Sequence, residues 1–143
     1  MGQVKCKKLK CHISVDKENS LYNRIGGHTV IAELANRFYD VMQRDELADT
    51  VLTMHPKDLT RSRKRLEHYL CEWFGGPKLF GEMYVNPEWT KLRHQHLDIG
   101  TAERDQWMHC MTTAMRELDF DIELQQELTN KFFELAGFVR SRV

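Results

Sequence analysis

A helical repeat of apolar residues runs through most of the chain, and it limits the possible folds more than any other feature. Between residues 28 and 42, the apolar side chains Ile31, Leu34, Phe38 and Val41 follow one another at intervals of three and four residues. This spacing brings side chains to one face of a helix. Valine, isoleucine and threonine do not alternate as they do in strands, and there are only three prolines. We therefore expect an all-α protein with helices over 28–42, 45–52, 60–74, 101–118 and 121–140.

The ends of these helices are marked by residues that favour caps and turns. Gly75, Gly76 and Pro77 end the helix over 60–74. Thr101 is the expected N-cap of the next long helix, and Asp121 begins the last one. We expect the four main helices to pack as two pairs, with the short segment around residues 86–96 lying between the pairs in sequence.

The composition restricts the function classes. The chain has 143 residues, enough for one domain, with 21 basic and 21 acidic residues and a formal net charge of +0. A general nucleic-acid binder usually has a basic excess, so we expect none. No apolar run approaches the roughly 20 residues that cross a bilayer, and no signal-peptide pattern is present. We expect a cytoplasmic protein without membrane contact, with residues 1–20 as a solvated extension of a domain over 21–143.

The four cysteines give little support to a zinc site. Cys71 and Cys110 lie within helical patterns, where a cysteine is usually a small buried hydrophobic residue. Cys6, Cys11 and His12 are close in sequence, but their spacing fits no standard zinc motif. No HExxH motif occurs either.

Two histidines in the stretch LRHQHLDIG, His94 and His96, are the strongest candidates for a ligand. On a helix they would lie about 200° apart, so both could not bind one metal. Heme needs only one imidazole, an apolar slot and cations for its propionates. His94 supplies the imidazole, and Arg65 and Arg93 are candidate propionate partners. The candidate slot is formed by Leu66, Leu70, Phe74, Leu79, Leu97 and Ile99.

Six segments of the chain, in the same order, resemble the group II truncated hemoglobins. They are YNRIGG, RFYDVM, MHPKDL, EWFGGPKLF, LRHQHLDIG and ERDQWMHCM. The resemblance runs from about residue 21 to residue 140 and leaves the first 20 residues outside. It implies a globin-like 2-on-2 α-helical sandwich around heme b, with an N-terminal extension.

The resemblance also assigns roles to individual residues. It implies that His94 is the proximal ligand of the heme iron, and that Tyr39, His55 and Trp107 lie on the distal side, where an exogenous ligand binds. It further implies that the distal pocket is lined by Ser62 and Leu66. The loop between Gly76 and His94 is one residue longer than in the family, which affects the heme contacts expected from that loop.

The expected function is reversible binding of O2 and other diatomic ligands such as CO and NO. Oxidation of NO and reduction of H2O2, with electrons from an unidentified reductase, are the candidate redox uses. The alternative from another class is a helical interaction or sensor domain without heme. A visible spectrum distinguishes the two, because heme has a strong Soret band.

Overall fold

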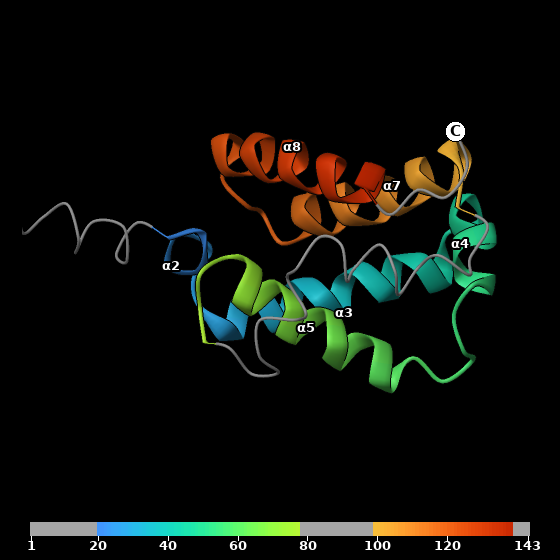
Figure 1. Cartoon of the computed structure of the whole chain (residues 1–143), viewed down its shortest axis with the longest axis horizontal. Helices are drawn as coiled ribbons and strands as arrows, with labels where there is room; N and C mark the ends of the chain where they lie inside the picture. Colours follow the sequence, from blue (N-terminus) through green and yellow to red (C-terminus); the bar gives the residue numbers. More distant parts are fainter. Residues whose placement is uncertain (1–19, 78–98, 139–143) are drawn as a thin grey trace, which may run out of the picture.

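The computed structural model describes residues 20–77 and 99–138, and helices make up most of them. Figure 1 shows two layers, α3 with α5 below and α7 with α8 above. The predicted long helices are confirmed, with ends that differ by one or two residues, whereas the helix expected over 45–52 is divided into η1 and α4. The elements are α2 (Leu21–Ile25), α3 (His28–Arg44), η1 (Glu46–Ala48), α4 (Asp49–Thr53), α5 (Thr60–Trp73), α7 (Thr101–Glu117) and α8 (Ile122–Phe138).

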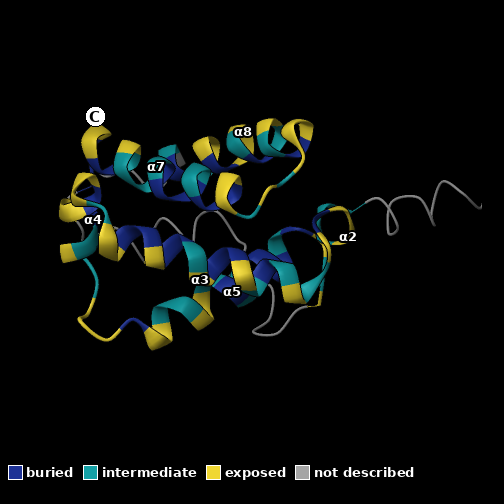
Figure 2. Ribbon diagram, turned by 180° about the vertical axis from the view of Figure 1, so that it is seen from behind, coloured by how far each residue is buried: buried dark blue, intermediate teal, exposed yellow. Residues whose placement is uncertain are grey.

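The hydrophobic core lies between the two layers. The apolar stripe predicted on α3 is completely buried, from Ile31 to Val41. Met111 of α7 and Phe132 of α8 are equally inaccessible. Figure 2 shows the buried residues on the sides of the helices that face one another. The expected pairs α3–α5 and α7–α8 are confirmed, and α3 also packs against α7, so α3 is the helix that joins the layers.

The described cysteines behave as the sequence predicted. Cys71 and Cys110 are both buried and free, while Cys6 and Cys11 lie outside the described residues. Within residues 20–77 and 99–138, no helix combines the length and hydropathy needed to cross a membrane.

The start of α7 differs from the prediction. The residue before the helix is Gly100, and Thr101 is its first helical residue. The Glu103 carboxylate reaches back and accepts the Gly100 N–H at 2.8 Å, so the first turn forms without a threonine cap. Asp121 begins the last helix as expected, because its carboxylate accepts the backbone N–H groups of Glu123 and Leu124.

Two glycines after α5 allow the end of this helix to pack against α2. Gly75 has a φ of +95°, a conformation that favours glycine. The Gly76 N–H donates to the Cys71 carbonyl at 2.7 Å, and the Tyr22 N–H donates to the Phe74 carbonyl at 2.8 Å. A Cβ atom on Gly76 would overlap the Tyr22 ring. The absence of a side chain at Gly76 is therefore what allows α2 to pack here.

We predict that Gly76→Ala destabilises the protein by about 1–3 kcal/mol, the usual cost of forcing extra volume into a packed site. Gly137→Ala is the matched control, because a Cβ on Gly137 meets nothing within 4 Å. Thermal unfolding of both variants measures the effect. Equal melting temperatures for the two variants would contradict the close packing of Tyr22 on Gly76.

Candidate functional site

Three predicted distal residues form one chain of ring contacts through Phe38 and Tyr39, although they come from different parts of the sequence. Tyr39 is on α3, Trp107 is on α7, and His55 follows α4. The ring centroid of Phe38 lies 4.9 Å from that of Tyr39 and 5.1 Å from that of Trp107. The Tyr39 and His55 rings meet edge to face, with centroids 5.5 Å apart. Folding therefore gathers a phenol, an indole and an imidazole in one place.

The Tyr39 hydroxyl is held in its protonated form. Its side chain is buried, and burial raises the pKa of the phenol far above its ordinary value of 10.0. The guanidinium of Arg63, 5.9 Å from the ring centroid, opposes this increase without reversing it. Tyr39 therefore has a proton to donate at neutral pH.

The backbone determines which nitrogen of His55 carries a proton. His55 Nδ1 lies 2.9 Å from the carbonyl oxygen of Val51. A carbonyl oxygen only accepts hydrogen bonds, so Nδ1 is the protonated nitrogen. In the neutral ring Nε2 is consequently an acceptor. The same Val51 carbonyl also accepts the Met54 N–H at 3.1 Å, which fixes the chain next to His55.

Trp107 is fixed by aromatic packing from both layers. Its ring centroid lies 5.1 Å from that of Phe38 on α3 and 5.7 Å from that of Phe132 on α8. Phe132 in turn contacts Trp73 and Phe74 at the end of α5, at 5.5 and 5.9 Å. The indole has one N–H and can only donate, so this packing sets the position of a fixed donor.

The other predicted site residues fall into three groups. Leu70, Phe74 and Ile99 are buried. Ser62 and Leu66 are partly buried, and Leu66 packs against the core, whereas Arg65 is exposed. The remaining predicted site residues, and His96 with them, lie outside the described residues: Leu79, Arg93, His94 and Leu97.

Arg63 is a residue near the site that the sequence-based prediction missed. It forms an ion pair with Asp40 at 2.9 Å and donates to the Asn36 carbonyl at 2.8 Å. A signal was present, because Arg63 falls on the same helical stripe as Leu59 and Leu66. A cation on an apolar stripe indicates a paired or stacked position.

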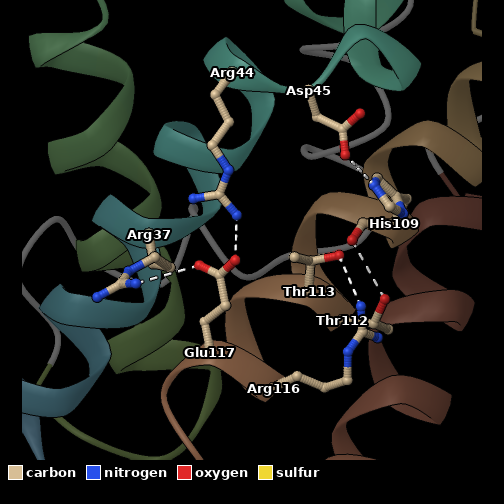
Figure 3. Close-up of polar contacts among 8 residues, drawn as sticks. All are labelled: Arg37, Arg44, Asp45, His109, Thr112, Thr113, Arg116 and Glu117. Carbon is tan, nitrogen blue, oxygen red and sulfur yellow. Dashed lines mark hydrogen bonds and ion pairs between the residues drawn. The ribbon is translucent and has the colours of Figure 1, made fainter.

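Polar contacts join α7 to α3 and to the turn that follows it (Figure 3). His109 Nε2 lies 2.6 Å from Asp45 Oδ2. Glu117 accepts from both Arg37 and Arg44. These contacts join α7 to α3 and to the turn after it, and all of them lie on the part of α7 that follows Trp107.

Comparison with known proteins identifies the fold family. Residues 20–141 match the family model described as bacterial-like globin. The chain belongs to the group II truncated hemoglobins. Its fold is therefore the 2-on-2 helical sandwich that the sequence predicted, and the family binds gaseous ligands through heme.

Individual relatives agree with this assignment. The cold-adapted truncated hemoglobin of the Antarctic bacterium Pseudoalteromonas haloplanktis TAC125 is 34% identical, with a TM-score of 0.80 over 87% of this chain and 99% of that one. The group II 2-on-2 hemoglobin of Agrobacterium tumefaciens is 31% identical, with a TM-score of 0.79 over 87% and 95%. Group 2 truncated hemoglobin YjbI of Bacillus subtilis is 27% identical over 110 residues, 77% of this chain and 80% of that protein.

The described part of the site fits heme in its chemistry. Leu66, Tyr69 and Trp73 of α5 and Trp107 of α7 pack against the core and yet are only partly buried. They leave apolar surface uncovered on helices of both layers. A flat apolar group would cover that surface, with the donors of Tyr39 and Trp107 nearby.

We predict that Asp45→Asn lowers the stability of the protein at neutral pH. The hydrogen bond from His109, followed by that from the Leu47 N–H, lowers the pKa of the Asp45 carboxyl below its ordinary value of 3.8. A lowered carboxyl pKa stabilises the fold above the unfolded-state value and is lost as pH falls through the folded-state value. The difference in melting temperature between parent and variant should therefore disappear at a pH below 3.8.

Thermal unfolding from neutral to acid pH measures this difference. The control is Asp105→Asn, an exposed aspartate on α7, which should change the melting temperature far less. A difference for Asp45→Asn that stayed constant down to the lowest pH would contradict this explanation from the Asp45 hydrogen bonds.

Proposed function

We propose that this globin binds O2 reversibly at heme b, with His94 as the proximal ligand and Tyr39, His55 and Trp107 on the distal side. The observation that carries the proposal is that these three side chains lie together, with Tyr39 and Trp107 against Phe38 and His55 against Tyr39. We further propose that Arg65 and Arg93 pair with the heme propionates. In this proposal the heme and its pocket are lined by Ser62, Leu66, Leu70, Phe74, Leu79, Leu97 and Ile99.

Hydrogen-bond donors explain how such a pocket retains O2. Ferrous heme supplies electron density to the ligand, which acquires partial negative charge. Trp107 can only donate, and the raised pKa of Tyr39 keeps its hydroxyl protonated. A hydrogen bond to a charged partner contributes about 1.5–3 kcal/mol, or roughly ten- to more than a hundredfold in affinity. Two donors in a buried pocket therefore favour slow release.

The proton on His55 Nδ1 affects the two donors differently. With Nδ1 bonded to the Val51 carbonyl, Nε2 of the neutral ring is an acceptor. The Tyr39 hydroxyl can rotate and give its proton to that acceptor, since the two rings are in contact. The indole of Trp107 has no such freedom. We therefore propose that Trp107 is the principal donor to O2.

Slow release of O2 suits redox chemistry better than transport. We propose that CO, NO and H2O2 also reach the pocket, and that oxidation of NO or reduction of H2O2 are candidate reactions, with electrons from an unidentified reductase. A helical interaction or sensor domain without heme was the alternative that the sequence left open. Membership of a heme-binding family favours the heme protein.

We predict that His94→Ala loses heme or binds it weakly, and that added imidazole restores part of the binding. His96→Ala should leave the visible spectrum nearly unchanged, because residues two apart on a helix point in opposite directions. Visible absorption of the purified variants, together with transfer of heme to an acceptor protein, measures both effects. The reverse result would mean that His96 holds the iron.

We predict that Trp107→Phe speeds O2 dissociation by roughly ten- to a hundredfold, the effect of losing one hydrogen bond to a charged partner. Tyr39→Phe should change the rate less, or slow it, and the double variant should be non-additive because both groups face one ligand. Stopped-flow displacement of O2 by CO measures all three rates. A strong increase for Tyr39→Phe, with Trp107→Phe within about twofold of the parent, would make the phenol the principal donor.

A further inference from the structure

Gln106 of α7 forms a long-range hydrogen bond to the backbone of α4. Its side-chain Oε1 accepts the backbone N–H of Val51 at 3.0 Å, across 55 positions of sequence. Gln106 immediately precedes Trp107 on α7, and Val51 lies in α4, four residues before His55. The hydrogen bond therefore joins the helix that carries the distal indole to the segment that carries the distal imidazole.

The N–H of Val51 needs such a partner. The first turn of a helix leaves its N–H groups without partners inside the helix. The N-cap of α4 is Ala48, which makes no side-chain hydrogen bond, and Val51 is 4% exposed and so almost hidden from water. Gln106 supplies the acceptor from another helix.

The carbonyl of Val51 accepts hydrogen bonds from the segment that contains His55. It accepts His55 Nδ1 at 2.9 Å and the Met54 N–H at 3.1 Å. One residue is thus held by Gln106 through its N–H and holds His55 through its carbonyl. A displacement of Val51 would change the partner of His55 Nδ1 directly.

A second hydrogen bond joins the same face of α7 to the segment after α3. His109 lies three residues after Gln106, which places both on the same side of a helix. His109 pairs with Asp45 (Figure 3). The other carboxylate oxygen of Asp45 accepts the Leu47 N–H in η1. Gln106 is the contact nearer to Trp107 and His55, and the only one of the two that reaches α4 among the described residues.

We propose that Gln106 is a positioning residue which, through Val51, keeps His55 protonated at Nδ1, so that the neutral distal histidine accepts hydrogen bonds and does not donate to O2. The proposal rests on the proposed O2-binding function. It assigns to Gln106 a role in ligand release without contact with the ligand. When the Val51 carbonyl is no longer held in place, the His55 ring is free to carry its proton on Nε2 and to donate.

Gln106→Leu removes the acceptor and keeps a similar volume. We expect it to slow O2 dissociation by roughly tenfold or more, as one added hydrogen bond to a charged partner would. In the CO complex the C–O stretch should move to lower frequency, because a new donor faces the ligand. Gln106→Glu keeps an acceptor oxygen at the same reach and should behave like the parent. In a His55→Leu background, Gln106→Leu should have no effect on the rate.

Gln125→Leu is the matched control. Gln125 also holds a backbone group, since its Nε2 donates to the Phe120 carbonyl at 2.7 Å, and it is partly buried like Gln106. Its loss should leave O2 dissociation unchanged. Gln106→Asn, which keeps the amide but shortens its reach, should slow dissociation in the same direction as Gln106→Leu and provides the test if the leucine variant does not fold. An unchanged rate in both Gln106→Leu and Gln106→Asn, or a slowing that persists without His55, would overturn the proposal.

Nitrogen-15 NMR of the histidine rings separates this proposal from the proposed function. At about pH 8, above the ordinary histidine pKa, His55 of the full chain should carry its proton on Nδ1, and Gln106→Leu should shift it to Nε2. This result does not require O2 binding, so it decides the role of Gln106 even if the chain proves to bind no O2. Equal tautomers in parent and variant would overturn the role of Gln106.

Discussion

Phe38 packs against Trp107 where the layer of α3 meets the layer of α7, with ring centroids 5.1 Å apart. Phe38 is fully buried, and its sequence neighbour Tyr39 is nearly so. On the other side, Trp107 rests on Phe132 of α8. Aromatic contacts thus run from α3 through α7 to α8. Because Tyr39 and Trp107 belong to this packing, the same contacts that stabilise the fold set the positions of the two proposed distal donors.

Hydrogen bonds and ion pairs, in addition to packing, determine how α7 lies against α3 and against the segment that follows it. Exposed ion pairs such as Arg44–Glu117 contribute little free energy individually. They nevertheless fix how far α7 is displaced along α3. The segment that follows α3 buries Ala48 and Val51 in the core, and specific polar partners on α7 add to that packing. Gln106 and His109 supply those partners from one face of α7. His55 is positioned through them, whereas Trp107 is positioned by packing.

The sequence predicted the long helices because each buries one apolar face, and an apolar face requires apolar residues at intervals of three and four. The cap of α7 was predicted wrongly, since the choice between Gly100 and Thr101 depends on a glutamate that reaches back from the first turn. The proton position of His55 could not be predicted, because its partner is the backbone carbonyl of Val51. Arg63 could have been found, because it interrupts an apolar stripe. The roles of the distal side chains came from family resemblance, since a lone tyrosine or tryptophan on a helix face is usually core.

We propose that the two layers enclose one heme, on whose distal side a ligand meets Tyr39, His55 and Trp107. The most direct test is visible absorption of the full chain titrated with hemin, then reduced and exposed to O2 and again to nitrogen. We expect a Soret band that saturates at one heme per chain, and a ferrous spectrum that changes with O2 and returns when O2 is removed. A titration without saturation, or a ferrous spectrum that O2 only bleaches, would contradict the account.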